Sequence, residues 1–140
     1  MLKVLIIGTG NSARSQMAEG LLRSFLAGRI EVHSAGTHPS RVNPLAIEVM
    51  KELGIDISGH RSKSVGEFAG QEFYYVITVC DSAREACPVF TGRVQRLRWS
   101  FEDPAAVSGS VEERKAVLRR VRDQIAQHLR DFVGGVTPKG

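Results

Sequence analysis

A loop of small and polar residues, 8–15, follows a run of apolar residues near the start of the 140-residue chain. It comprises Gly8, Thr9, Gly10, Asn11, Ser12, Ala13, Arg14 and Ser15. Glycines let the backbone turn so that successive N–H groups face one point, and a following helix adds its own unbonded N–H groups. Arg14 adds a planar guanidinium that holds two oxygens at once. The loop is therefore predicted to bind a tetrahedral oxyanion.

Two other interpretations of this loop exist. It satisfies the pattern G-x-G-x-x-G/A of dinucleotide-binding proteins. That pattern expects an acidic residue at the end of the next strand to bind a ribose, whereas residues 33–36 read His-Ser-Ala-Gly. The other interpretation is a turn between strand and helix with no ligand. An arginine buried in the turn would be unusual for a dinucleotide site, so oxyanion binding is favoured.

The elements that position the loop follow from the hydrophobic pattern. Residues 2–7 are almost continuously apolar, which is typical of a strand buried in a parallel sheet, and apolar residues at helical spacing follow between Ser15 and Gly28. Further strands are predicted over residues 31–35, 73–79 and 94–99, the last at a sheet edge because it is more polar. Alternating strands and helices predict a three-layer α/β domain with a four-stranded parallel sheet flanked by helices.

Two later helices carry their own start signals. Asn43-Pro44 is typical of a helix N-terminus, and that helix is expected to end at Gly54. Ser110 and Glu113 form a capping-box pattern at the start of a long helix that is expected to end before Gly134. Its predicted apolar face comprises Val111, Leu118, Val121, Ile125, Leu129 and Phe132. Its other face, with Lys115, Arg119, Arg120 and Arg122, is interpreted as solvated.

Length and composition narrow the class of protein. The chain and its 42% hydrophobic content fit one domain, predicted over residues 1–133 with a flexible tail over 134–140. Nineteen Lys and Arg against fifteen Asp and Glu give a net charge of +4 that is spread along the chain, so we expect no nucleic-acid partner. The apolar run 2–7 is too short for a secretory signal or a membrane span. We expect a cytoplasmic monomer with no membrane partner.

The two cysteines leave redox chemistry open, and the histidines do not suggest metal binding. Cys80 and Cys87 are too few for a secreted disulfide framework, and indicate either redox chemistry or small buried residues. The polar segment between them is compatible with a helix that Pro88 ends, so both thiols flank a segment able to refold. The four histidines, His33, His38, His60 and His128, lack metal-ligand spacing. We expect no cofactor and no metal.

Motifs over most of residues 3–132 resemble those of thioredoxin-coupled arsenate reductases, relatives of low-molecular-weight protein tyrosine phosphatases. The resemblance rests on residues 9–20, Thr-Gly-Asn-Ser-Ala-Arg-Ser-Gln-Met-Ala-Glu-Gly, and on shorter motifs at residues 34–36, 43–44, 55–58, 78–80, 87–88 and 99–104. It implies an oxyanion loop of the form C-x-x-x-x-x-R, in which Arg14 matches the arginine and the nucleophilic cysteine falls at position 8. This chain has Gly8 there, which carries no nucleophile.

The resemblance implies a redox relay in an intact family member. The loop thiolate attacks arsenate while the aspartate that matches Asp103 protonates the departing oxygen. Cys80 then attacks the first sulfur and releases arsenite, and Cys87 resolves that disulfide to one between residues 80 and 87, which thioredoxin reduces. Without the resemblance, Asp103 reads as a turn residue. Ala105 and Ala106 follow where tyrosine phosphatases carry aromatic residues, which favours a small inorganic anion.

Some arsenate reductases of this type bind potassium beside the loop. Asn11, Glu19 and Ser34 match three of the oxygen donors, but the fourth position is Lys63 rather than a carboxylate. We expect the Lys63 ammonium to lie near Glu19 and to replace the cation, so no potassium dependence is predicted.

Several functions stay open at this point. The chain is an arsenate reductase by descent whose catalysis is impaired because Gly8 replaces the nucleophile, or it is an oxyanion-binding or regulatory protein for arsenate, phosphate or sulfate. A third possibility is a dithiol partner of thioredoxin that uses only Cys80 and Cys87. A function like that of the low-molecular-weight tyrosine phosphatases is a further alternative.

Overall fold

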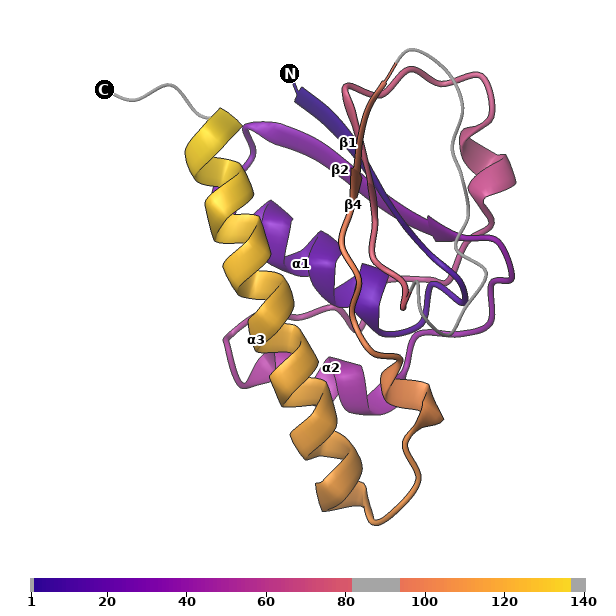
Figure 1. Cartoon of the computed structure of the whole chain (residues 1–140), viewed down its shortest axis with the longest axis vertical. Helices are drawn as coiled ribbons and strands as arrows, with labels where there is room; N and C mark the ends of the chain where they lie inside the picture. The colour runs from indigo at the N-terminus through magenta and orange to yellow at the C-terminus, as the bar shows by residue number, and fades with distance from the viewer. Residues whose placement is uncertain (1, 82–93, 137–140) are drawn as a thin grey trace.

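A computed structural model describes residues 2–81 and 94–136, which form an α/β fold (Figure 1). The strands are β1 (Leu2–Gly8), β2 (Ile30–Gly36), β3 (Tyr75–Thr78) and β4 (Gln95–Arg98). The helices are α1 (Arg14–Leu26), α2 (Pro44–Lys51) and α3 (Val111–Val136), with 3-10 helices η1 (Val65–Phe68) and η2 (Pro104–Ala106). The predicted class, a four-stranded parallel sheet flanked by helices, is confirmed.

The sheet has the strand order β2-β1-β3-β4, and every pair is parallel. β1 is therefore an inner strand, and β4, which the sequence places at an edge, is an edge strand. Ile7 pairs with Ala35 on one side and Thr78 on the other, so the carboxyl ends of three strands lie next to one another. Loop 8–15 leaves the middle one of these three ends, where ligands of parallel sheets bind.

The two faces of β1 pack into separate apolar clusters. Val4 and Ile6 belong to the main core with residues of α1, α2 and α3, and α1 and α3 lie on the same side of the sheet (Figure 1). Leu5 belongs to a second cluster on the other face with Phe68 of η1 and Phe73. This alternation follows from the period of two along a strand, and it buries β1 on both faces as its apolar sequence predicts.

The predicted helix starts are confirmed. Asn43 Oδ1 accepts hydrogen bonds from the backbone N–H groups at the start of α2, at 2.9 and 3.4 Å. Ser110 and Glu113 form the reciprocal capping box of α3, with bonds of 3.1 and 3.3 Å. α3 continues to Val136 rather than ending before Gly134, and the rest of the expected tail, residues 137–140, lies outside the described residues. In the described parts of the chain, no helix is long and apolar enough to cross a membrane.

The interpretation of one α3 face as solvated is wrong for Arg122, although Arg120 on that face is exposed. Arg122 is 7% exposed and donates to Val49 O at 2.7 Å and to Glu52 Oε1 at 2.9 Å. Arg119 forms a fork with the same carboxylate, and its hydrogen bond is the main reason that the pKa of Glu52 falls to about 2. Val111, assigned to the apolar face, is 53% exposed. The periodicity of α3 alone cannot show that Glu52, the residue after α2, packs against this face.

Gly36, at the end of β2, lets loop 8–15 pack against the strand. A Cβ at Gly36 would lie 2.4 Å from Thr9 O and 2.9 Å from the backbone N of Asn11. Both neighbours are backbone atoms of the loop, so a side chain at this position can be accommodated only if the loop moves. The shape of the loop therefore depends on a glycine in the adjacent strand.

We predict that Gly36→Ala destabilises the protein and disturbs the loop. Overpacking of this kind costs about 1–3 kcal/mol of unfolding free energy. Gly59→Ala is the matched control, because a Cβ at Gly59 meets no atom within 4 Å. Urea unfolding of both variants measures the difference. Equal stability of the two variants would contradict the prediction.

Candidate oxyanion site

The carbonyl oxygens of loop 8–15 are bonded to segments outside the loop. Thr9 O accepts from His38 N at 2.9 Å, Gly10 O from Ser62 Oγ at 2.8 Å, and Ser12 O from Asn43 N at 2.9 Å. In a trans peptide the C=O and N–H point in opposite directions, so these bonds turn the N–H groups of the same peptide units toward the other side of the loop. Several N–H groups turned to one side form an anion-binding arrangement.

A pocket of about 240 Å³ lies at this loop. All eight predicted loop residues line it, together with Ser40, Asp103 and Ala105. The structure thus brings Asp103 to the loop, across nearly 90 residues of sequence. Ala105, which the family resemblance places after Asp103 where tyrosine phosphatases carry aromatic residues, does line the pocket. Ser40 was not predicted, because its place in the pocket depends on how distant segments pack.

Arg14 and Asp103 meet at the wall of the pocket. The Arg14 side chain is 7% exposed, and its Nη1 donates to Phe101 O at 3.2 Å. Its Nη2 lies 3.6 Å from Asp103 Oδ1, which also accepts from Ala105 N at 3.0 Å and so caps η2. The guanidinium and the carboxylate are therefore each fixed by a backbone contact beside the pocket.

The side chain of Asn11 links the loop to its surroundings. Asn11 is 1% exposed and has a φ of 48°, a left-handed conformation that asparagine tolerates better than most residues. Its Nδ2 donates to Ser15 Oγ at 2.9 Å and Ser34 Oγ at 3.0 Å. Its Oδ1 accepts from Gln16 Nε2 and from Lys63 N, both at 2.9 Å. The amide thus forms four hydrogen bonds and holds the loop in this turn.

Cys80 lies just after β3 and is 1% exposed. Its carbonyl accepts from Phe101 N at 3.3 Å, and Phe101 O accepts from Arg14, so one residue connects Cys80 to the loop arginine. Cys80 is not among the residues that line the pocket. Cys87 lies outside the described residues, so its pairing with Cys80 stays a prediction.

Comparison with known proteins identifies the family of the chain. Residues 3–139 match the family model of the low molecular weight phosphotyrosine protein phosphatases. The chain belongs to this family. An arsenate reductase from Halalkalibacterium halodurans is 42% identical, covering 92% of this chain and 93% of the relative. A solved arsenate reductase in its phosphate binding state is 36% identical with a TM-score of 0.80, covering 98% of this chain and 100% of the other.

A third similar protein is an arsenate reductase that depends on thioredoxin. A thioredoxin-dependent arsenate reductase from Corynebacterium glutamicum is 26% identical with a TM-score of 0.68, covering 96% of this chain and 63% of the other. The relatives and the fold therefore place the chain among the arsenate reductases of the family, and the resemblance inferred from the sequence is confirmed.

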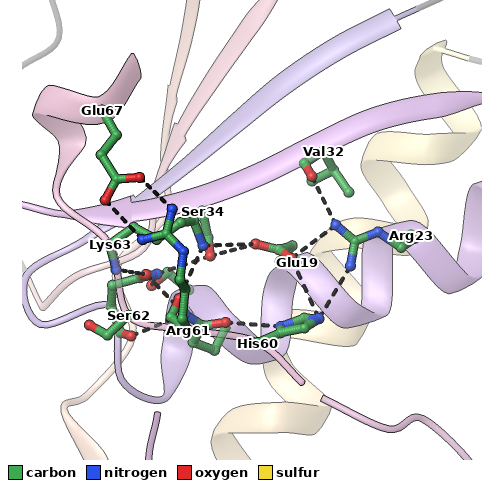
Figure 2. Close-up of polar contacts among 12 residues, drawn as sticks. Glu19, Arg23, Val32, Ser34, His60, Arg61, Ser62, Lys63 and Glu67 are labelled. Carbon is green, nitrogen blue, oxygen red and sulfur yellow. Dashed lines mark hydrogen bonds and ion pairs between the residues drawn. The ribbon is translucent and has the colours of Figure 1, made fainter. Parts of the chain in front are cut away.

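A buried carboxylate beside the loop is surrounded by basic side chains (Figure 2). Glu19 on α1 is 6% exposed at its side chain. Its Oε1 accepts from Ser34 Oγ at 2.7 Å and lies 3.8 Å from Lys63 Nζ. Its Oε2 accepts from Arg23 Nη2 at 2.9 Å and lies 3.5 Å from His60 Nε2. We call these five residues the Glu19 cluster.

The Glu19 cluster does not fit a potassium ion. The predicted position of Lys63 near Glu19 is confirmed, and its ammonium also donates to Arg61 O at 3.2 Å. A positive charge thus already faces the carboxylate that would help to bind the cation. Burial lowers the pKa of Lys63, and the Glu19 carboxylate opposes that effect. Within residues 2–81 and 94–136, no group of three or more His, Cys, Asp or Glu side chains is placed to hold a metal ion.

We predict that oxyanion binding does not depend on potassium. The phosphate affinity of the unmodified protein is expected to be the same in potassium chloride and in choline chloride of equal ionic strength, measured by calorimetry. Lys63→Asp removes the internal cation and adds a carboxylate, so its affinity is expected to rise when potassium replaces choline. A potassium effect in the unmodified protein would show that Lys63 does not replace the ion.

His60 connects the Glu19 cluster to the loop. Its Nδ1 lies 2.9 Å from Gln16 Oε1, and the Gln16 amide donates to Asn11 Oδ1 at 2.9 Å. Its Nε2 lies 3.2 Å from Arg23 Nη1, a donor, so the neutral ring with the proton on Nδ1 fits both contacts. Burial lowers the pKa of His60 from 6.5, although the Glu19 carboxylate opposes the shift.

We predict that His60 makes folding stability depend on pH. Because its folded pKa is lowered, the unfolded chain takes up the proton first as the pH falls below 6.5, and stability declines down to the folded pKa. Above 6.5 His60 contributes no further change. Urea unfolding from about pH 5 to 8 is expected to show a smaller decline in His60→Gln. Parallel curves for the two proteins would refute this role.

Proposed function

We propose that this chain binds a tetrahedral oxyanion in loop 8–15, and that it is an arsenate reductase by descent whose turnover is impaired because Gly8 supplies no nucleophile. The observation that carries the proposal is the pocket, in which outward carbonyls leave N–H groups for a ligand and Arg14 forms one wall. Arsenate, phosphate and sulfate share the tetrahedral shape and negative charge that such a site binds. The phosphate binding state of a solved relative supports phosphate as a probe.

Gly8 is not required by the backbone. It is absent from the glycines with positive φ, so its conformation suits any residue. A Cβ at this position would lie 3.0 Å from Ser15 Oγ, a close contact that rotation or a small shift of the serine relieves. A cysteine thus fits at position 8 with a modest adjustment. Glycine itself offers no atom for attack on arsenic.

The other site residues keep the roles that the family resemblance implies. Arg14 would bind two oxygens of the oxyanion, and Asp103, on the pocket wall 3.6 Å from Arg14, would give a proton to a departing oxygen. Cys80 and Cys87 would end the cycle as a disulfide that thioredoxin reduces. The thioredoxin-dependent relative from Corynebacterium glutamicum supports this choice of reductant.

The pocket favours an inorganic anion over phosphotyrosine. No aromatic residue is among the eleven that line it in the described structure, and Ala105 occupies the wall next to Asp103. A phenyl ring gains binding free energy mainly by packing against other apolar or aromatic groups. A site without such groups gains little affinity for an aryl phosphate ester over an inorganic anion. The alternative of a tyrosine phosphatase is therefore the weaker one.

A regulatory oxyanion binder is the second candidate function. Gly8 is the observation that favours it, because a thiolate at this position would repel an incoming anion and glycine does not. Such a protein would bind arsenate, phosphate or sulfate without turning it over. A nucleophile introduced at position 8 would restore arsenate reduction to an impaired enzyme, but not to a protein that only binds the oxyanion.

The test combines binding with restored chemistry. Calorimetric titration with phosphate is expected to show binding that Arg14→Ala weakens about 10- to 100-fold, the usual effect of removing a charged hydrogen-bond donor. Arg41→Ala is the control, since Arg41 is exposed and does not line the pocket. Gly8→Cys is expected to reduce arsenate with thioredoxin as the reductant.

Each part of this experiment can contradict the proposal. Absence of binding at millimolar phosphate would reject the oxyanion site. An equal loss of affinity in Arg41→Ala would show that Arg14 acts only through the net charge. If Gly8→Cys folds and binds phosphate yet reduces no arsenate, the regulatory function replaces the enzymatic one.

A further inference from the structure

The part of the pocket next to Gly8 is narrow on the side of Ser15 and holds no side chain from position 8. Among the described residues other than its chain neighbours, two atoms lie within 4 Å of a Cβ built on Gly8: Ser15 Oγ at 3.0 Å and Ser15 Cβ at 3.3 Å. Gly8 also lines the pocket that contains Arg14 and Asp103. In the described structure, this space is therefore bounded by Ser15 on one side and continuous with the oxyanion pocket on the other.

Ser15 is placed to stabilise a negative charge in that space. It is 1% exposed, and its Oγ accepts a hydrogen bond from Asn11 Nδ2 at 2.9 Å. A hydroxyl that accepts from Asn11 keeps its own proton for donation. Ser15 also lies in the first turn of α1, where unbonded N–H groups favour an anion. The space next to Gly8 thus has a hydrogen-bond donor and a favourable electrostatic environment.

We propose that this space binds a small external thiolate, such as hydrosulfide, which attacks the bound oxyanion in place of a side chain at position 8. The proposal rests on the oxyanion binding proposed above. Hydrosulfide has one heavy atom, so it can lie slightly farther into the pocket than a Cβ on Gly8 and within hydrogen-bond reach of Ser15, where a bulkier thiol would clash. Repulsion between the two anions is offset by the Arg14 guanidinium and the N–H groups of the loop.

The reaction balances with two thiols. The thiolate sulfur forms a bond to arsenic, and one arsenate oxygen leaves as water after it receives protons, one of them from the Asp103 carboxyl group. A second thiol from solution then attacks the bound sulfur, and the sulfur–arsenic bond breaks with its electron pair on arsenic. Arsenic(V) becomes arsenic(III) and leaves as arsenite, while the two thiols are oxidised to a disulfide.

The protein contributes by holding the two reactants together. Placing a nucleophile next to its target replaces an encounter in solution by a reaction within one complex. The rate is then expected to saturate with both arsenate and hydrosulfide, whereas the reaction in free solution rises in proportion to each. Saturation is the kinetic sign of a site for the thiol.

The experiment measures arsenite formed from arsenate and sodium hydrosulfide. The unmodified protein is expected to give a saturating rate on the order of tenfold above the protein-free reaction. Gly8→Ala places a methyl group in the proposed space and is expected to lose this excess, and calorimetry with phosphate reports whether its loop still binds. Because the methyl could disturb the loop itself, the unmodified protein is also assayed with a tertiary alkyl thiol, which is expected to give no excess.

Two results would overturn the proposal. Equal rates for the unmodified protein and a phosphate-binding Gly8→Ala variant would show that the space next to residue 8 is not used, and oxyanion binding would stand. An equal excess with the tertiary thiol would likewise place the reaction outside the loop. If the unmodified protein binds no phosphate, the proposed function fails as well, and calorimetry distinguishes that case.

Discussion

The oxyanion loop depends on one buried amide, that of Asn11. A carboxamide offers two donors and an acceptor oxygen, and here each is used within the interior. Through these bonds Asn11 joins the loop to α1, to β2 at Ser34 and to the segment at Lys63. An unpaired amide at 1% exposure would be costly, so the four partners fix one orientation of the side chain. That orientation fixes the left-handed turn at residue 11, and with it the direction of the neighbouring peptide groups.

Lys63 connects the loop to the buried charge of Glu19. Its backbone N–H donates to Asn11, while its ammonium lies 3.8 Å from the Glu19 carboxylate. A buried carboxylate needs a compensating charge and hydrogen bonds, and the Glu19 cluster supplies both from the chain itself. The cation is therefore covalently tied to the segment that holds the loop. A free ion in its place would have to be bound from solution, whereas Lys63 is positioned by folding.

The elements that could be predicted from the sequence are those defined by local signals. Asn43 before a proline, and Ser110 three residues before Glu113, satisfy helix ends through short-range hydrogen bonds, and both do so in the structure. Arg122 is different, because its burial depends on a carboxylate that another helix brings to it. The need for glycine at position 36 also has no local sequence signal, because it arises from the loop that packs against this residue. Contacts between distant segments leave little trace in the periodicity of either segment.

The residues of the candidate site likewise divide into those with a local sequence signal and those placed by contacts between distant segments. Residues 8–15 could be predicted because a strand, a glycine-rich turn and a helix occur in direct succession. From its local sequence Asp103 is typical of a turn, and Cys80 is compatible with either redox chemistry or a small buried residue. The family resemblance gave both residues specific roles. Ala105 gained its meaning from the family resemblance, as a small residue where tyrosine phosphatases carry aromatic ones, and Ser40 gave no signal because its contribution is the shape of the wall. Residues that act by shape are found only when the packing is known.

Binding and chemistry are physically separable in this loop. The bonds that shape it run from the carbonyls of residues 9–12 and from the Asn11 side chain to neighbouring segments. Arg14 is likewise fixed through Phe101 O and faces Asp103. Under the proposed function, glycine at position 8 offers no attacking atom, while the supports of the anion site do not depend on that residue. A loop held from outside in this way is shaped to bind an oxyanion whether or not its first residue carries a nucleophile.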